Sequence, residues 1–216
     1  MSIEIRIRVY QPGDEAAIRT IACDTANLGN LVEPIFSDRE TVADLLTRYY
    51  TAYEPQRIWV GESGQRVVGY LTGCFDSRRY RWIMVSRIVP RVVLGAVSRG
   101  ALRRQETWRL LTTALANSRR GRFRYGSRLK NYPAHLHINI LDEFRHRHLG
   151  QKLVQRFLEQ VRQNRLPGVH AAVRSDNETA CGFFRRMEFK ELHRLSITLP
   201  AVSGGSDEIV IFGKQV

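Results

Sequence analysis

Cysteine is scarce in this sequence, and long apolar runs are absent. The 216 residues include three cysteines, Cys23, Cys74 and Cys181, which lie far apart and in none of the usual spacings of metal ligands. Such an odd, scattered set excludes a complete disulfide framework, so we expect a reducing cytoplasm and no bound metal. The longest uncharged apolar run in the basic middle of the chain, Val92 to Ser98, is far shorter than the about 20 residues that cross a bilayer. We therefore expect a cytoplasmic protein that is peripheral to a membrane at most.

Acidic residues are nearly missing from one segment. The formal net charge is +13, and residues 78–130 hold 14 Arg and one Lys against a single acid, Glu106. This segment alone carries +14, so the rest of the chain is close to neutral. Pro90, Gly95 and Gly100 interrupt its first half, whereas Leu102 to Ala116 has the apolar spacing of a helix. We expect a basic, partly helical insertion at about residues 78–130 within a single domain that spans residues 1–216.

Strand and helix patterns succeed one another on both sides of this insertion. Ile3 to Tyr10 alternates apolar and charged residues, which is typical of a half-buried strand. Asp14 is expected to cap a first helix, and Ser37 begins the S-x-x-E spacing of a capping box for a second. Residues 57–62 and 66–75 then form a predicted hairpin. From residue 135 onwards the pattern is strand, helix, strand, helix, strand, so the order as a whole predicts an α/β (α+β) fold with a mixed sheet and helices on both faces.

The first strand after the insertion leads into a candidate anion-binding loop. His135 to Ile140 is the strand, Arg145 to Gly150 the loop, and an amphipathic helix runs on from Gln151. A loop that opens directly into a helix directs backbone N–H groups and the positive end of the helix dipole at one point, which suits a pyrophosphate. An ordinary strand-to-helix turn with solvated arginines remains the alternative.

Two ordered motifs in this region resemble those of the GNAT superfamily of N-acetyltransferases. Arg145 to Gly150 reads R-x-x-H-x-G, similar to the family's R/Q-x-x-G-x-G/A, and Asn177 begins a stretch similar to N-x-x-A-x-x-F-Y-x-x-x-G-F. The resemblance implies a mostly antiparallel sheet of about 6–7 strands, with a splayed parallel pair that binds acetyl-coenzyme A as co-substrate. It assigns the cofactor to Ile140, Leu141, Arg145, His146, Arg147, His148, Leu149, Gly150, Gln151, Asn177, Phe183 and Phe184.

The resemblance also implies how the acetyl group would be transferred. An extended pantetheine arm can pair with the splayed strands as though it were a strand itself. A backbone N–H near Ile140 or Leu141 is expected to polarise the thioester carbonyl, while a bound amine attacks it directly. The implied activity is acetyl transfer to a small-molecule or peptide amine, and the sequence does not choose among such acceptors.

Three residues depart from the family's pattern. His148 replaces the first glycine of the loop, and Glu188 replaces a glycine near the end of the second motif. Phe184 replaces the tyrosine that often protonates the departing thiolate, and a phenyl ring cannot donate a proton. These departures keep a second hypothesis open, namely a non-catalytic module that binds coenzyme A or a partner.

Three residues are candidates for the catalytic base. His135 and His137 share one face of their strand because side chains alternate, and Glu143 follows shortly after it. His170, on the neighbouring predicted strand, is a further option. Imidazoles suit this task because they titrate near neutrality. The competing interpretation is that the histidines are hydrogen-bonded residues of the core or its rim.

The basic insertion has three possible roles. Its arginines could favour an acidic acceptor, or they could contact a nucleic acid or an anionic membrane surface. Alternatively, it is a folded subdomain, such as one at a homodimer interface, whose arginines are merely solvated. Its many apolar residues exclude a solvated tail, so we expect it to fold against something, in this chain or in a partner.

Overall fold

The computed structural model describes residues 4–27, 29, 31, 32, 36–119, 129–196 and 208–216. Among these residues a seven-stranded sheet runs in the order β1-β2-β3-β4-β5-β7-β6. The β4–β5 pair is parallel and the other five pairings are antiparallel, as expected for the mixed sheet. The strands are β1 (Arg6–Val9), β2 (Ile58–Ser63), β3 (Arg66–Cys74), β4 (Ala134–Ile140), β5 (Gly168–Arg174), β6 (Lys190–Ser196) and β7 (Glu208–Gln215).

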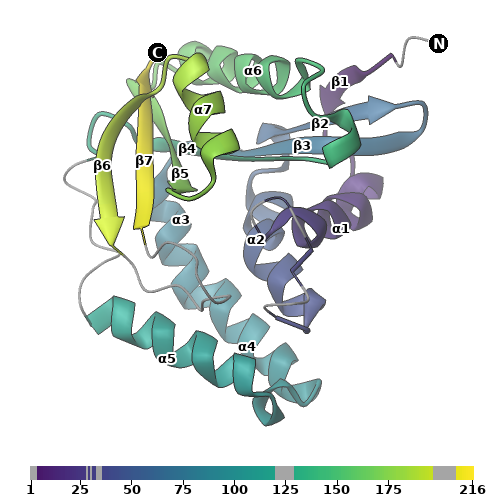
Figure 1. The fold of residues 1–216 in the computed structure, drawn as a ribbon, viewed down its shortest axis with the longest axis vertical. Helices are drawn as coiled ribbons and strands as arrows, with labels where there is room; N and C mark the ends of the chain where they lie inside the picture. Colours follow the sequence, from purple (N-terminus) through teal and green to yellow (C-terminus); the bar gives the residue numbers. More distant parts are fainter. Residues whose placement is uncertain (1–3, 28, 30, 33–35, 120–128, 197–207) are drawn as a thin grey trace.

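Helices cover both faces of this sheet, so the predicted fold class is confirmed (Figure 1). On one face lie α1 (Glu15–Thr25) and α2 (Arg39–Tyr53), and on the other lie α6 (Leu149–Gln163) and α7 (Glu178–Arg186). Two main apolar cores result, and Cys23 of α1 and Ala43 of α2 belong to a smaller third cluster. The α6–α7 core contains Phe157 and Phe212, and the α1–α2 core contains Tyr49 and Tyr50. Each face therefore has its own set of buried side chains against which functional groups can be held.

The two predicted helix caps near the N-terminus are both corrected. The side chain of Asp38, rather than that of Ser37, accepts the backbone N–H of Thr41 and caps α2. Asp14 does stand at the start of α1, but its carboxylate accepts bonds from Arg8 at 2.7 and 2.8 Å instead of capping the helix. Asp14 forms two hydrogen bonds with the positively charged Arg8, and Asp38 both caps α2 and accepts from Arg99, so charged partners distant in sequence accompany both departures from the spacing rule.

The strand predicted at Ile3 to Tyr10 is shorter than expected. Of its residues, Arg6 to Val9 pair with β2, and Ile3 lies outside the described residues. The alternating pattern predicted that Val9 would be buried, but Val9 is exposed. Arg8 is half-buried between Asp14 and Glu62. The hairpin of β2 and β3, by contrast, forms as predicted.

The basic insertion begins as one nearly continuous helical rod. The rod comprises α3 (Ser77–Ile83), the π-helical turn η3 (Met84–Ile88) and α4 (Val89–Ser98). After the rod come η4 (Ala101–Arg103) and α5 (Gln105–Arg119). The interruption predicted at Pro90 and Gly95 is wrong, because both lie within α4. Pro90 is the second residue of α4, which directly follows the π-helical turn η3, and the N–H of Val89 still bonds to the carbonyl of Met84. Gly100, with φ +73°, ends the rod. Residues 120–128 of the insertion lie outside the described residues.

The rod is folded against α2, as expected for so apolar a segment. Ile83, Ile88 and Val92 are buried in the α1–α2 core. Arg99 donates to both carboxylate oxygens of Asp38, the residue that caps α2, and Ser37 donates to Glu106 of α5. The insertion is thus attached to the start of α2 by both apolar and polar contacts.

Candidate active site

The parallel strands β4 and β5 separate soon after they meet. Ala134 pairs with Val169 and His135 pairs with His170. Beyond His135 and His170, the described residues of the two strands form no further pairs. On its other edge β4 stays paired with β3 as far as Ile140. A V-shaped opening results, with its vertex at His135 and its mouth at the C-terminal end of β4.

Backbone geometry identifies the donors that face this opening. The N–H of Leu141 donates to the carbonyl of Val68 on β3 at 3.0 Å, so Leu141 cannot direct it into the opening. Hydrogen-bonded pairs alternate along an antiparallel ladder, so the backbone groups of Ile140 and Ile138 point away from β3, towards β5. The N–H and carbonyl of Ile138 and the N–H of Ile140 therefore give the opening a free strand edge with which an extended ligand can pair, while the carbonyl of Ile140 accepts from Arg145.

The loop after β4 is held in place by Arg145. Its Nε donates to the carbonyl of Ile140 at 3.2 Å, and its two terminal nitrogens donate to Asp142 at 2.8 Å and to the carbonyl of Gly29 at 3.3 Å. Arg145 thus fixes the loop to the strand end and to the segment after α1. His146 and Arg147 are exposed, as is Lys152 on the first turn of α6, so Arg147 and Lys152 carry the positive charge on the outer side of the loop.

Two histidines give this loop its shape. His146 and His148 both have φ +59°, the left-handed conformation that glycine adopts most readily. The loop therefore keeps the conformation that a glycine at position 148 would allow, and His148 bears a strain of about 1 kcal/mol for it. Directly after His148, α6 begins at Leu149, Gly150 and Gln151, whose N–H groups have no acceptor within the helix. These N–H groups make the start of α6 an anion-binding point next to the opening.

Gly150 allows α6 and α7 to approach the mouth of the opening closely. A Cβ atom built there would lie 3.2 Å from Cε2 of Phe183 and 3.3 Å from Cδ1 of Ile140. Both contacts are tighter than ordinary van der Waals packing, so a larger side chain would displace Phe183 or Ile140. Three of the residues expected at the cofactor, Ile140, Gly150 and Phe183, are therefore brought together.

The second motif has a structural part and a buried part. The side chain of Asn177 accepts the N–H of Ala180 at 3.0 Å and caps α7. Phe184 is 4% exposed, stacks on Phe212 at 5.8 Å and contacts Phe189 edge-to-face. Its ring extends the apolar wall of the α6–α7 core and supplies no proton donor.

The end of α7 explains the second replaced glycine. Glu188 has φ +61°, and the N–H groups of Glu188 and Phe189 bond to the carbonyls of Arg185 and Phe184. This is the helix-ending arrangement in which glycine usually takes the left-handed position. Glu188 adopts that conformation despite its side chain, which pairs with Lys214 at 2.9 Å.

His135 is a buried histidine with both ring nitrogens engaged. Ser77 donates its hydroxyl to the carbonyl of Pro133 at 2.7 Å, so its oxygen accepts the Nδ1–H of His135 at 2.8 Å. Nε2 of His135 then accepts the Tyr50 hydroxyl at 2.9 Å. Burial, together with His137 and His170, lowers the pKa of His135 well below its usual value. The ring is neutral and has no lone pair left with which to take a proton from an acceptor.

His137 lies one step nearer the mouth on the same face of β4. Its ring stands edge-to-face to those of His135, at 5.7 Å, and Tyr50, at 5.9 Å. Burial, and to a lesser extent His170, lowers its pKa to about 4. Tyr50 and His135 exclude water from part of the ring, while the residue as a whole is exposed, so water stabilises its charged form better than that of His135. Of the two, His137 is the imidazole that solvent and a ligand can reach.

His170 and Asn139 complete this face. His170 is buried beside His135, with Nδ1 bonded to the carbonyl of Tyr132 at 2.8 Å, and burial lowers its pKa. Asn139 donates to the hydroxyl of Tyr70 at 2.7 Å. The shared face that alternation predicted for His135, His137 and Asn139 is thus present, and it lies on the α1–α2 side of the sheet.

Glu143 is not gathered with the histidines. It lies past the C-terminal end of β4, is exposed, and accepts a hydrogen bond from Arg66 at the start of β3 at 2.9 Å. Arg66 and His135 occupy opposite ends of the β3–β4 pair, whose register runs from Gly69↔Ile140 to Cys74↔His135. The third candidate base thus stands at the mouth of the opening, in an ion pair.

Sequence reasoning did not find the residues that control His135. Tyr50 comes from α2 and Ser77 from the start of α3, 85 and 58 positions away in sequence. Tyr80 of α3 stands edge-to-face to the His135 ring at 4.6 Å. A tyrosine on a helical apolar face is equally consistent with plain core packing, so no local pattern could have identified these partners.

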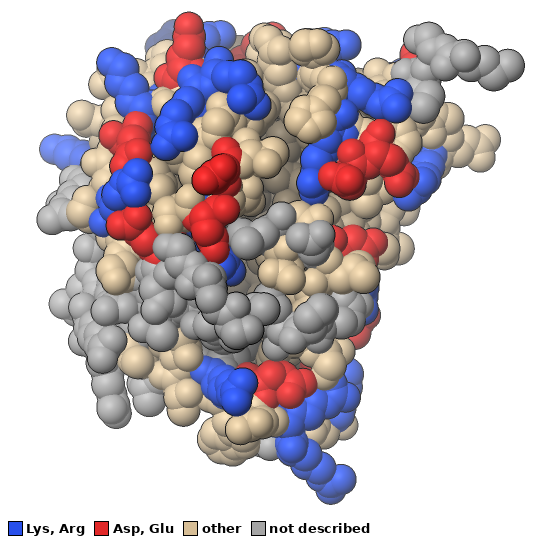
Figure 2. Space-filling view, viewed as in Figure 1, with Lys and Arg blue, Asp and Glu red and all other residues tan. Residues whose placement is uncertain are grey.

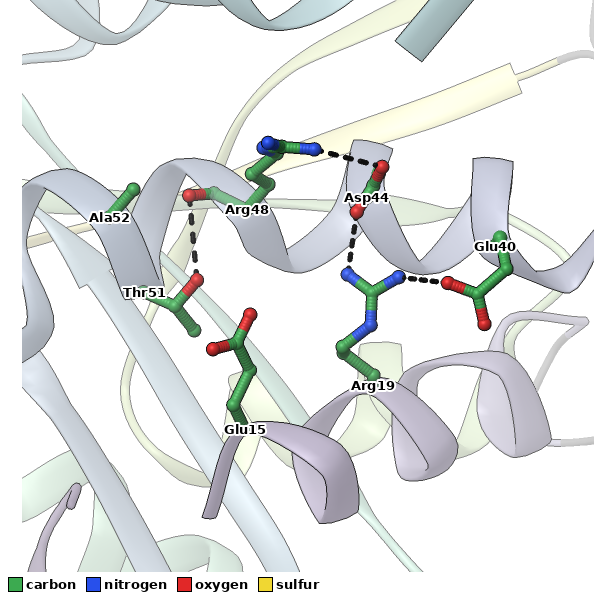
Figure 3. Close-up of a pocket in the computed structure, with 7 residues that line it drawn as sticks. All are labelled: Glu15, Arg19, Glu40, Asp44, Arg48, Thr51 and Ala52. Atoms are coloured by element: carbon green, nitrogen blue, oxygen red, sulfur yellow. Dashed lines mark hydrogen bonds and ion pairs between the residues drawn. The ribbon is translucent and has the colours of Figure 1, made fainter. Parts of the chain in front are cut away.

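An open groove of about 450 Å³ lies apart from this opening, between α1 and α2 (Figure 3). In it Arg19 of α1 reaches across to Asp44 and Glu40 of α2, at 2.6 Å each, and Arg48 also pairs with Asp44. Figure 3 shows the Arg19 ion pairs spanning the two helices, whereas Arg48 and Asp44 pair along α2. Because these charges neutralise one another, we assign the groove to helix packing and not to the chemistry.

The chain is similar to known acetyltransferases. The model of the acetyltransferase (GNAT) family matches residues 25–189. Among solved structures, SsHAT superposes with a TM-score of 0.75 at 24% identity, over 98% of both chains. The ribosomal-protein-alanine N-acetyltransferase of Brucella melitensis gives 0.59 at 15% identity, over 98% of this chain and 99% of that one. The yncA protein of Salmonella typhimurium, solved with its cofactor acetyl-CoA, gives 0.60 at 15% identity, over 98% and 93%.

These structural likenesses show the fold, and the family match extends over most of the chain, including β4, the loop and α7. The chain therefore belongs to the GNAT family of acetyltransferases.

Proposed function

We propose that this protein transfers the acetyl group of acetyl-CoA to an amine, by direct attack in a ternary complex. The observation that carries the proposal is the free edge of β4 at Ile138 and Ile140, which ends at the start of α6. A strand edge and an anion-binding helix start, placed end to end, match an extended pantetheine arm joined to a pyrophosphate. Family membership supports acetyl-CoA as the co-substrate.

The residues of the opening divide the work of binding. The N–H groups of Leu149, Gly150 and Gln151 receive the pyrophosphate, with positive charge from Arg147 and Lys152. The backbone of Ile140 pairs with the pantetheine arm as it runs from the mouth towards the vertex. The thioester then lies deeper than Ile140, where the next free donor on this edge is the N–H of Ile138. We assign to Ile138 the polarisation of the thioester carbonyl, the role expected at Ile140 or Leu141 from sequence.

His137 is the base in this proposal. It holds a neutral imidazole beside Ile138, on the face that solvent reaches, and takes the proton lost by the attacking amine. The amine nitrogen bonds to the carbonyl carbon, the C–S bond breaks, and the sulfur leaves as a thiolate that water protonates, because Phe184 cannot. Tyr50 and Ser77 hold His135 neutral, which keeps positive charge away from its neighbour His137.

Release of free thiol from acetyl-CoA, measured with and without a panel of amines, tests the activity. We expect amine-dependent release, with His137→Asn lowering kcat by 10²-fold or more. In the wild type the acid limb of the kcat/KM profile should lie below pH 6.5, since the pKa of His137 is lowered. Binding of acetyl-CoA with no amine-dependent release would instead indicate the non-catalytic module.

Proline substitution tests the polarising donor. Ile138→Pro removes an N–H that the β3 ladder does not use, and Ile138→Val is the matched control that keeps the N–H while trimming the side chain. Loss of one such donor costs about 10²- to 10³-fold in kcat. Equal kcat in the two variants would refute the assignment of this role to Ile138.

A further inference from the structure

The outer face of the α3–η3–α4 rod is apolar and, in the described part of the chain, exposed to solvent. Its inner face is buried against α2 through Ile83, Ile88, Val92 and Ala96. On the outer face Val85 is 72% exposed, Leu94 69% and Trp82 59%. Val89, Val93 and Val97 are exposed along the same rod, four positions apart. We call these six residues the apolar stripe, and we infer that it is built to enter an apolar phase, because aligned exposed residues of this kind are unusual on a solvated helix.

Basic side chains accompany the stripe, and acids do not. No Asp or Glu occurs from Ser77 to Gln105, whereas eight arginines do. Two of them serve the fold, since Arg99 pairs with Asp38 and Arg104 bonds to Ser37. Arg78, Arg79 and Arg87 are exposed, and the Arg87 guanidinium lies 5.4 Å from the Trp82 ring. In Figure 2, Lys and Arg side chains lie around the end of the molecule that Figure 1 assigns to α4 and α5.

An anionic partner with an apolar interior fits this combination best. A nucleic acid would use the arginines but would leave Val85 and Leu94 in water. A second copy of the chain, docked through the same face, would set arginines against arginines with no acid on the rod to neutralise them. A bilayer with anionic headgroups meets both requirements, because its surface attracts arginine and its acyl boundary accepts valine, leucine and tryptophan.

We propose that the α3–η3–α4 rod lies in the surface of a membrane rich in anionic lipid, with the apolar stripe inserted and the arginines at the headgroups. No helix among the described residues is long and apolar enough to cross a membrane, so the attachment is to one surface. Ser77 and Tyr80 of α3 contact His135, but neither belongs to the apolar stripe, and vesicle binding is measured without the acetyl-transfer reaction.

Vesicle sedimentation tests the proposal with the full-length protein. We expect it to sediment with vesicles of equal parts phosphatidylglycerol and phosphatidylcholine and to stay in solution with phosphatidylcholine alone. Arg78→Gln combined with Arg79→Gln should lower the partition coefficient about thirty-fold at low salt. Val85→Ser combined with Leu94→Ser should lower it at least tenfold. The emission of Trp82, compared with a Trp82→Phe variant, should shift to the blue on binding.

Matched controls stand elsewhere on the surface. Leu46→Ser removes an exposed apolar side chain from α2, and Arg162→Gln combined with Lys190→Gln removes two exposed charges from α6 and β6. Both should bind vesicles as the wild type does.

Three results would overturn the proposal. The first is equal binding to neutral and anionic vesicles, or to neither. The second is binding to duplex DNA that Arg78→Gln with Arg79→Gln abolishes while vesicle binding is absent. The third is a dimer in sedimentation velocity that Val85→Ser with Leu94→Ser converts to a monomer, which would assign the stripe to self-association.

Discussion

Acidification should destabilise this protein well above the pH at which its carboxylates titrate, because of His135. The side chain is 5% exposed, its two nitrogens are bonded to Ser77 and Tyr50, and its pKa is lowered well below its usual value. In the unfolded chain the same imidazole titrates at a pKa of about 6.5. Below that pH, His135 binds a proton in the unfolded state and stays neutral in the folded state, so the free energy of unfolding falls as the pH falls.

The magnitude follows from this difference in proton binding. A histidine that stays neutral in the folded state removes up to about 1.36 kcal/mol per pH unit below its unfolded pKa. Between pH 7.5 and 5.5 the loss from His135 amounts to about 1.4 kcal/mol. Carboxylates add little in this window, since the pKa values of Asp14 and Asp38 are themselves lowered by their arginine partners against the effect of burial.

Urea denaturation at pH 7.5, 6.5 and 5.5 measures this effect. His135→Gln replaces the imidazole by an amide that does not titrate, so the variant should be less stable at pH 7.5 but should lose about 1.4 kcal/mol less than the wild type on going to pH 5.5. His170, whose pKa is also lowered, contributes equally to both proteins and cancels in the comparison. The same pH dependence in both proteins would show that His135 takes up its proton in the folded state, and the buried, neutral assignment would be wrong.

The remaining predictions concern three positions where the backbone or the packing is tight. Glu188→Gly should raise the free energy of unfolding by about 1 kcal/mol, because glycine relieves the left-handed strain and the lost ion pair with Lys214 is exposed; a thermal melt in which the variant is no more stable would contradict this. His148→Gly should leave the affinity for acetyl-CoA within about threefold of the wild type, because glycine adopts the left-handed conformation readily. The β-branched His148→Val should lower the free energy of unfolding by about 1–2 kcal/mol and weaken acetyl-CoA binding. Equal affinities for the two variants would show that the loop conformation does not affect binding. Gly150→Val should weaken acetyl-CoA binding at least tenfold by displacing Phe183 or Ile140, while Gly150→Ala, whose Cβ requires its neighbours to move by only a few tenths of an ångström, should weaken it less; calorimetric titration separates them, and unchanged affinity in Gly150→Val would place the cofactor elsewhere.

Local patterns predicted the elements of this fold well, and long-range contacts decided where the predictions failed. The β2–β3 hairpin formed as expected because two β-rich runs flank a short turn, a signal confined to residues 57–75. Ser37 and Asp38 are both good capping residues at adjacent positions, so spacing alone could not choose between them. The choice of Asp38 depends on Arg99, which arrives from 61 positions away and adds a charged contact to that carboxylate.

The sequence likewise predicted one part of the candidate site and left another part ambiguous. The resemblance to a family placed Ile140, Gly150 and Phe183 in one region, and they do lie together. The histidines were ambiguous because period-two alternation fixes the face of a strand and not the depth of a side chain. Tyr50 and Ser77 bury His135, whereas His137, two positions on, stays accessible to solvent. Which of two neighbouring histidines can act as a base is therefore a property of α2 and α3, and the strand sequence does not contain it.

The central claim is that the free edge of β4 binds acetyl-CoA, and calorimetric titration of acetyl-CoA into two variants at Ile140 tests it most directly. Ile140→Pro removes the N–H that points into the opening, and Ile140→Val keeps it. We predict one-to-one binding by the wild type and by Ile140→Val, with at least tenfold weaker binding by Ile140→Pro. Equal affinity in all three proteins, or no binding by the wild type, would contradict the claim.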